Sequence, residues 1–267
     1  MPSLRLHRSM LLLSVAGLTL PFGASATPEA SPVEAVPPLA TIIARVVARD
    51  DATQKMLHSM QYQQFTHTEE LNANGQATKH QDLLVIVKPG ATQEINVVSV
   101  KGDNLPSDPD EAAQQAKGQE IERRKHNFSL KNLVARFTIS YAGTEDYMGE
   151  KAYVLAFEPK PHQPYADQTE KVLNQLHGTL LISAKDDVVL RTEATLVHPV
   201  AVAWIFARIK TLDFHYELRT TTNPFGPAWL QVFVQVEAPL LTVRQRQTVE
   251  MNQFEPRGKL ADNRNPF

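Results

Sequence analysis

Alternating apolar and polar residues are the feature that most constrains the fold of this chain. In the clearest stretch, residues 133–141, every second side chain is apolar or aromatic: Leu133, Ala135, Phe137, Ile139 and Tyr141. Successive side chains of a β-strand point to opposite faces of the sheet. The stretch therefore predicts a strand with one buried face.

Segments of the same character recur along the chain, separated by turn-forming residues. After a turn at residues 147–150, apolar residues alternate again at Tyr153, Leu155 and Phe157, which predicts a long hairpin with the preceding strand. Another hairpin is expected within residues 60–88, and further strands at residues 95–100, 177–183, 188–196, 203–219, 229–236 and 241–254. About ten strands of this kind predict a mainly β protein with helices (α+β), built on one curved antiparallel sheet.

Helical patterns are expected at three places. An apolar stripe at helical spacing predicts an amphipathic first helix: Leu39, Ile42, Ile43, Val46 and Val47. Asp50 or Asp51 is expected to cap a further short turn that ends near Leu57. Residues 107–126 are polar and helix-favouring, which predicts a surface helix over the edge of the sheet or a mobile flap. A short helical stretch is expected at residues 167–175.

The amino-terminal residues predict a cleaved signal peptide. Arg5 and Arg8 precede an apolar run at residues 10–20, and small residues follow at 24–26. The alternative, a membrane anchor, needs about twenty apolar residues rather than this shorter run. We expect cleavage after Ala26 and export to the periplasm or cell envelope.

The rest of the chain is expected to form a single domain. Residues 27–38 contain four prolines among small residues and predict an extended linker after the signal peptide at residues 1–26. The domain is expected at residues 39–256, followed by a frayed tail at residues 257–267.

Composition excludes several classes of function. The chain has no cysteine, which rules out disulfides, thiol catalysis and thiolate metal sites. Its formal net charge of −2 becomes more negative once Arg5 and Arg8 are removed, and its basic residues are dispersed apart from residues 123–125. Nucleic acid is therefore not an expected partner.

No pattern of catalytic residues is found. The sequence lacks a G-x-S-x-G elbow, a phosphate-binding loop, an H-E-x-x-H helix and an EF-hand loop. Its nine histidines are scattered rather than closely spaced on one element, so no metal or other cofactor is expected. Acidic neighbours such as Glu69 and Glu70 point to opposite faces of a strand. We expect a protein that is not an enzyme.

What remains is an apolar surface that either closes into an ordinary core or leaves a ligand cavity. The strand residues expected to line such a cavity are Phe137, Ile139, Tyr153, Leu155, Phe157, Trp204, Phe206 and Phe214. The residues expected on the covering lid helix are Ile42, Ile43, Val46 and Val47.

Several short motifs resemble those of a known family. Residues 82–90, which end in Lys88-Pro89-Gly90, and residues 95–102 resemble a strand, turn and strand of periplasmic lipoprotein carriers of the LolA/LolB type. Residues 143–160 look like the hairpin with the Y-x-L-x-x-x-P-K signature of that family, and residues 176–196 look like its next hairpin. Similar stretches occur in exported proteins described as outer-membrane lipoprotein-sorting proteins.

The resemblance implies an incomplete β-barrel whose concave apolar face is covered by helices and holds acyl chains. Two hypotheses follow. In the first, the chain is a periplasmic binding protein for a lipid, a lipoprotein acyl chain or another hydrophobic ligand. In the second, it is a sensor or interaction domain of the same fold, which acts on an envelope protein partner without carrying a ligand.

Overall fold

A computed structural model describes residues 36–90, 93–124, 129–203, 207–220, 225 and 228–256. The chain divides into two units, Met1–Val36 and Pro37–Phe267, and all the described helices and strands lie in the second. The predicted cleavage site, most of the linker and the tail lie outside the described residues. No helix in the described part is both long and apolar enough to cross a membrane.

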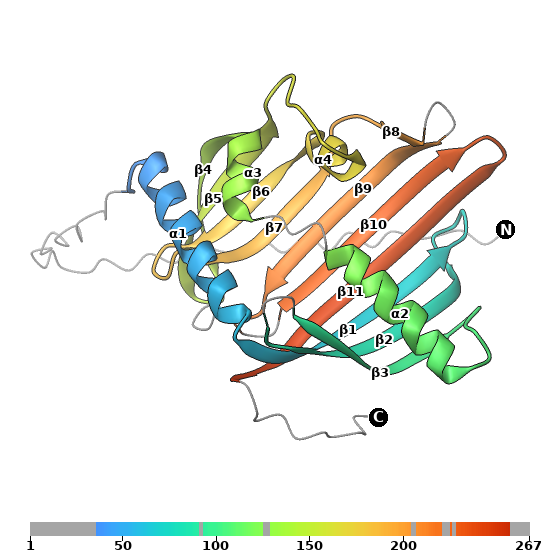
Figure 1. The fold of residues 1–267 in the computed structure, drawn as a ribbon. Coiled ribbons are helices and arrows are strands. Elements are labelled where there is room, and N and C mark those ends of the chain that lie inside the picture. The colour runs from blue at the N-terminus through green and yellow to red at the C-terminus, as the bar shows by residue number, and fades with distance from the viewer. Residues whose placement is uncertain are drawn as a thin grey trace, which may run out of the picture. The chain divides into compact units, whose positions relative to one another are not determined.

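Eleven strands form one antiparallel sheet (Figure 1). Their bounds are β1 Met60–Leu71, β2 Ala77–Lys88, β3 Glu94–Gly102, β4 Phe137–Tyr147, β5 Glu150–Pro159, β6 Leu176–Ser183, β7 Val189–Leu196, β8 Val200–Ala203, β9 Ala207–Leu218, β10 Ala228–Ala238 and β11 Leu241–Pro256. The strand order is β3-β2-β1-β11-β10-β9-β7-β6-β5-β4, and β8 pairs with β9. The sheet is open, with β3 and β4 at its edges, so the prediction of an incomplete antiparallel barrel with helices is confirmed.

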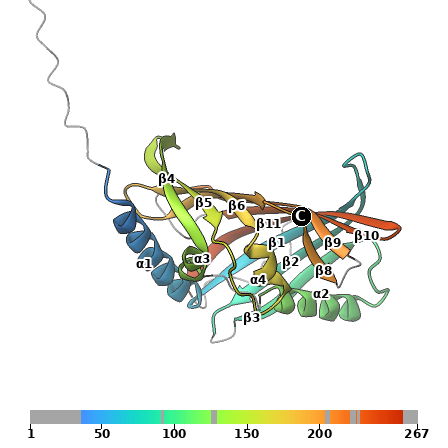
Figure 2. The same cartoon turned by 90° about the horizontal axis from the view of Figure 1, so that it is seen from above.

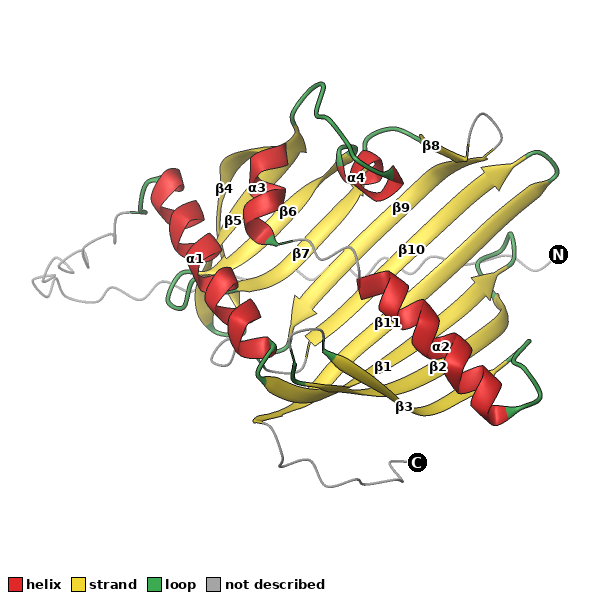
Figure 3. Cartoon of the chain, viewed as in Figure 1, coloured by secondary structure: helices red, strands yellow, loops and turns green. Residues whose placement is uncertain are grey.

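Four helices lie on the same face of the sheet (Figures 2 and 3). They are α1 Leu39–Leu57, α2 Pro109–Arg124, α3 Leu130–Arg136 and α4 Gln168–Leu173. This face carries the apolar residues of the alternating strands, because Phe137, Leu155 and Phe157 pack in one cluster with Ile42 and Val46 of α1. The opposite face is not covered by any described helix.

The first helix is longer than the sequence predicts. α1 continues without interruption to Leu57, and Asp50 does not cap a separate turn. Instead, Asp50 Oδ2 accepts a hydrogen bond from the backbone N–H of Leu130 at 3.0 Å, at the first residue of α3. Residues 52–57 contain no proline or glycine to end the helix, and α3 offers the carboxylate a donor from a different part of the chain.

The predicted strand at residues 133–141 is wrong in its first part. Residues 130–136 form α3, and β4 begins only at Phe137. Ser129 caps the helix, since its side chain accepts a hydrogen bond from the backbone N–H of Asn132. Apolar residues at 130, 133 and 134 also fit a helical period, so the sequence pattern allows either a strand or a helix here. The cap at Ser129 favours the helix.

The hairpin of β4 and β5 is confirmed, and its register explains which side chains meet. Ile139 pairs with Phe157 and Tyr141 with Leu155, after which a bulge shifts the register before Gly143. The rings of Phe137 and Phe157 make an edge-to-face contact with centroids 5.0 Å apart.

The strand predicted at residues 203–219 corresponds to β9 but was started too early, and the short strand β8 before it was not predicted. β8 ends at Ala203 and pairs antiparallel with β9, which begins at Ala207, so the chain reverses direction between them. Period-two alternation does not reveal such a reversal when no glycine or proline marks it.

The polar helix is confirmed at the edge of the sheet, where α2 packs along β3. Asp108 Oδ1 accepts a hydrogen bond from the backbone N–H of Asp110 at the start of this helix. Only a narrow face is buried, formed by Ala112, Ala116 and Glu120, and Glu120 accepts a hydrogen bond from Gln64 Nε2 of β1 at 3.1 Å. The remaining predicted elements, including the hairpin of β1 and β2 and the short α4 capped by Asp167, are also present.

Candidate functional site

The described residues among those predicted to line a cavity pack together with α1. Six residues named from the sequence are buried in one cluster: Ile42, Val46, Phe137, Tyr153, Leu155 and Phe157. Four others are partly buried against it: Ile43, Val47, Ile139 and Phe214. Trp204 and Phe206 lie outside the residues whose side chains are described. The first half of α1 is thus seated on a packed core.

An ion pair fixes this half of the helix from the outside. Arg45 Nη2 lies 3.0 Å from Asp187 Oδ1 in the turn between β6 and β7. Together with the burial of Ile42 and Val46, this contact anchors the helix on the β4–β7 side of the sheet.

The second half of α1 lies over an open cavity of about 300 Å³. Its described lining comes from α1, α3, β7, β9, β10, β11 and one turn residue: Asp50, Thr53, Gln54, Leu57, Leu130, Leu133, Val189, Thr192, Tyr216, Phe225, Ala228, Met251 and Phe254. None of the lining positions named from the sequence is in this set. The signal for it was present in α1, since Asp50, Thr53 and Leu57 continue the buried face of Val46 at spacings of three and four residues.

The lining is apolar at one end of the cavity. Leu57 ends α1 there, and Met251 and Phe254 approach from β11. Phe254 is held in place because its ring stacks on Tyr62, with centroids 5.1 Å apart and planes at 27°.

Two neutral polar residues of the lining, Thr192 and Tyr216, lie on the sheet opposite α1. Thr192 and Tyr216 are cross-strand partners on β7 and β9, on the sheet face that α1 covers. Burial, and after it the negative charge of Asp50, raises the pKa of Tyr216 to about 12. Tyr216 therefore remains a protonated hydroxyl, and a hydrogen-bond donor, at physiological pH.

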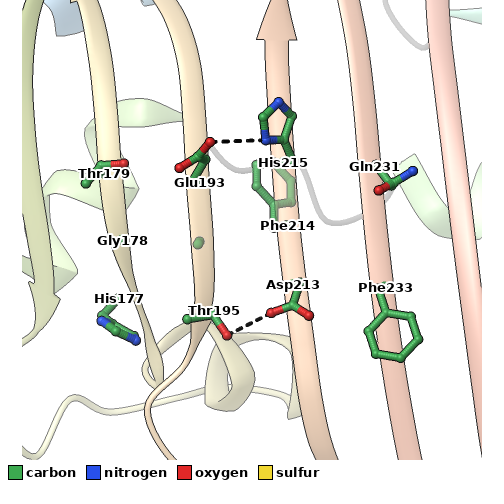
Figure 4. A pocket seen from close by; sticks show the side chains of 11 residues that line it. His177, Gly178, Thr179, Glu193, Thr195, Asp213, Phe214, His215, Gln231 and Phe233 are labelled. Carbon is green, nitrogen blue, oxygen red and sulfur yellow. Dashed lines mark hydrogen bonds and ion pairs between the residues drawn. The ribbon is translucent and has the colours of Figure 1, made fainter. Parts of the chain in front are cut away.

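A second hollow of about 380 Å³ lies on the other face of the sheet (Figure 4). Polar side chains of β6, β7, β9 and β10 surround it. His215 Nδ1 lies 3.4 Å from Glu193 Oε1, and Thr195 Oγ1 donates a hydrogen bond to Asp213 Oδ1 at 2.9 Å (Figure 4). Phe233 adds an aromatic ring at the rim. This hollow is a surface groove on an uncovered sheet face rather than an enclosed site.

The acidic neighbours noted in the sequence serve structural contacts. Glu69 accepts a hydrogen bond from Arg246 Nε at 2.7 Å, whereas Glu70 pairs with Lys79 at 2.9 Å. Arg246 is also the largest cause that lowers the pKa of Glu69. Among the described residues, no group of histidine and acidic side chains is arranged to hold a metal ion.

Comparison with known proteins finds likeness only between structures. No protein-family model matches the sequence, and a search of curated proteins gives no significant match. A DUF1329 family protein from Desulfovibrio piger is 10% identical, covering 85% of this chain and 96% of its own, with a TM-score of 0.35. A LolA superfamily protein from Nitrosomonas europaea is 11% identical, covering 82% and 95%, with a TM-score of 0.32.

A third similar structure is the MucA/MucB complex of Pseudomonas aeruginosa, 9% identical to this chain, covering 81% of it and 98% of the other chain, with a TM-score of 0.24. A LolA superfamily protein is thus one of the similar structures.

Proposed function

We propose that this chain is an exported binding protein that holds a hydrophobic ligand in the cavity beneath the second half of α1. The observation that carries the proposal is this mostly apolar, open cavity of about 300 Å³, lined by two helices and the sheet. Its volume lies at the lower end of the range of about 300–1,000 Å³ that is usual for small-molecule sites. The signal-peptide pattern of the first residues supports export.

The two halves of α1 differ in burial, which supports the proposal. The first half, with Ile42 and Val46, is buried in the core and ion-paired through Arg45, so it holds the helix on the sheet. The second half covers the cavity with only partly buried residues, among them Thr53 and Leu57. In this arrangement the core residues Phe137, Leu155 and Phe157 support the lid, and the ligand contacts the residues beside them.

Two tryptophan substitutions on α1 test the proposal. Thr53→Trp places a large ring in the cavity, whereas Ala52→Trp places the same ring on the exposed side of the helix. We expect wild type and Ala52→Trp to bind N-phenyl-1-naphthylamine, an uncharged hydrophobic dye, and Thr53→Trp to lose this binding while keeping its circular-dichroism spectrum. Equal dye binding by both variants, or none by the wild type, would sink the proposal.

A protein-interaction role is the second candidate, favoured by the polar groove on the uncovered face of the sheet. That groove presents Glu193, Asp213 and Phe233 to the outside, a mixture of charged and aromatic groups that suits a protein interface. A photo-crosslinking residue at position 179 in the groove should then give a discrete adduct in cells, while one at exposed Ala73 in the turn between β1 and β2 should not. The same yield at both positions would contradict this role.

A further inference from the structure

The described lining residues of the cavity beneath α1 carry charge of one sign only. Its described lining includes one carboxylate, Asp50, and no lysine, arginine or histidine. The other polar lining residues, such as Thr192 and Tyr216, are neutral. A carboxylate in a mainly apolar site is costly unless cations or hydrogen-bond donors face it.

Asp50 is held in position from within the protein. One of its oxygens, Oδ2, accepts the hydrogen bond from the backbone N–H of Leu130. This contact fixes the carboxylate at the point where α1 meets α3, and a carboxylate oxygen accepts more than one hydrogen bond. The carboxylate therefore has acceptor capacity beyond the Leu130 contact.

The polar and apolar ends of the cavity are separated along the helix. Asp50 and Leu57 are seven residues apart on α1, about 10 Å along the helix axis. Tyr216 on the sheet feels the charge of Asp50, and Thr192 is the cross-strand partner of Tyr216. Met251 and Phe254 belong to the strand beside Leu57. The cavity thus has the polarity of an amphiphile, with a head-group end and a chain end.

We propose that the cavity selects an amphiphile with a cationic amine head group, bound to Asp50, and disfavours amphiphiles with anionic head groups. This inference rests on the proposed function, since it names the class of ligand for the same cavity. An ammonium group supplies a cation, which the described lining residues lack, and donates charge-assisted hydrogen bonds to the carboxylate. A carboxylate or phosphate placed there meets a like charge with no cation among the described lining residues to offset it. A neutral alcohol falls between the two, because it donates a hydrogen bond without a charge.

Three ligands of equal chain length test the head group. Decylamine, decanol and decanoate are titrated at pH 7 against the full-length mature protein, with displacement of N-phenyl-1-naphthylamine as the readout. We expect affinity to fall in the order amine, alcohol, carboxylate. Equal affinities for the amine and the carboxylate would overturn the inference.

A matched pair of variants assigns the selectivity to one residue. Asp50→Asn keeps an oxygen that can accept the Leu130 hydrogen bond but removes the charge, whereas Asp51→Asn removes the charge of the next residue, which is not among the described lining residues. We expect Asp50→Asn to weaken decylamine binding about tenfold or more, as for loss of a charge-assisted hydrogen bond. Asp51→Asn should behave as wild type.

A spectroscopic readout separates this role from a structural one. Removing the charge of Asp50 removes one cause that raises the pKa of Tyr216, so tyrosinate absorbance in Asp50→Asn should develop at lower pH than in wild type. If Asp50→Asn still prefers the amine over the carboxylate, the head-group inference is overturned. The proposed function still stands in that case, provided that the wild type binds the dye. If the wild type does not bind the dye, both the head-group inference and the proposed function are overturned.

Discussion

Replacing Phe137 by alanine tests whether the strand residues beneath α1 form packed core. Phe137 is 6% exposed, at the first position of β4. Its ring makes an edge-to-face contact with Phe157, and both residues pack in the same cluster as Ile42 and Val46. It does not belong to the described lining of the cavity beneath α1.

The expected loss follows from this environment. Truncating a fully buried phenylalanine removes its transfer free energy and leaves a void, which together cost about 3–5 kcal/mol. Part of that loss is the edge-to-face contact with Phe157, since such pairs contribute about 0.5–1.5 kcal/mol beyond buried area. For a domain of this size each kcal/mol shifts the melting temperature by roughly 2–4 °C, so a decrease of roughly 6–20 °C is expected.

Urea denaturation followed by circular dichroism measures the loss as a change in midpoint at constant slope. Tyr141→Ala is the matched control, because Tyr141 lies on the same strand but is 39% exposed, and its loss should be clearly smaller. Dye binding should survive in Phe137→Ala under conditions where the variant is folded. A loss below about 1 kcal/mol together with altered dye affinity would refute the reasoning, because the ring would then border open space rather than core.

Three further outcomes are expected. Gly178→Ala should destabilise the fold, since a Cβ there would lie 1.8 Å from the backbone oxygen of Glu193. Gly118→Ala should stabilise the fold by about 0.5–1 kcal/mol, because a Cβ at this position in α2 would have no atom within 4 Å. Thermal melts check both, with a lower melting temperature expected for the first variant and a higher one for the second. The pKa of Glu69 is lowered below 4.5, chiefly by Arg246, so its contribution to stability is full above the unfolded-state pKa and is lost as the pH falls through the folded-state pKa. Glu69→Gln should therefore be less stable than wild type at pH 7. A stability difference that does not shrink toward pH 3 would contradict this. EDTA should leave the melting temperature unchanged, and a shift in the metal-replete protein would reveal a site that the described residues do not show.

Much of the secondary structure is predictable because it depends on neighbours in the chain. Asp108 and Asp167 stand at helix starts, and both side chains accept backbone N–H groups there. Alternation in β5 places Tyr153, Leu155 and Phe157 on one face, and all three are buried together. Where a segment fits two periods, as before Phe137, the prediction failed, because the choice depended on the cap at Ser129 and on the packing of α3 under α1.

The position of the cavity was not predictable in the same way. Asp50 looks like a capping residue from its neighbours, yet its partner is Leu130, eighty positions further along the chain. Thr192, Tyr216 and Met251 carry no local signal for a ligand site, since each occupies an ordinary strand position. The aromatic residues predicted from the sequence fill the core. The cavity lies beside them, under the second half of α1, where the face of the helix toward the sheet is no longer wholly apolar.

By itself, the sequence determined the mainly β class, the order of most elements and the apolar face of most strands, because periodicity and capping are local properties. Tertiary structure decided which strands are neighbours. The first and last strands, β1 and β11, pair with each other, which brings Tyr62 against Phe254, a residue that lines the cavity. Periodicity tells which face a side chain occupies but not what lies opposite it. The space between α1 and the sheet depends on side chains from distant segments, and only their packing fixes its size and charge.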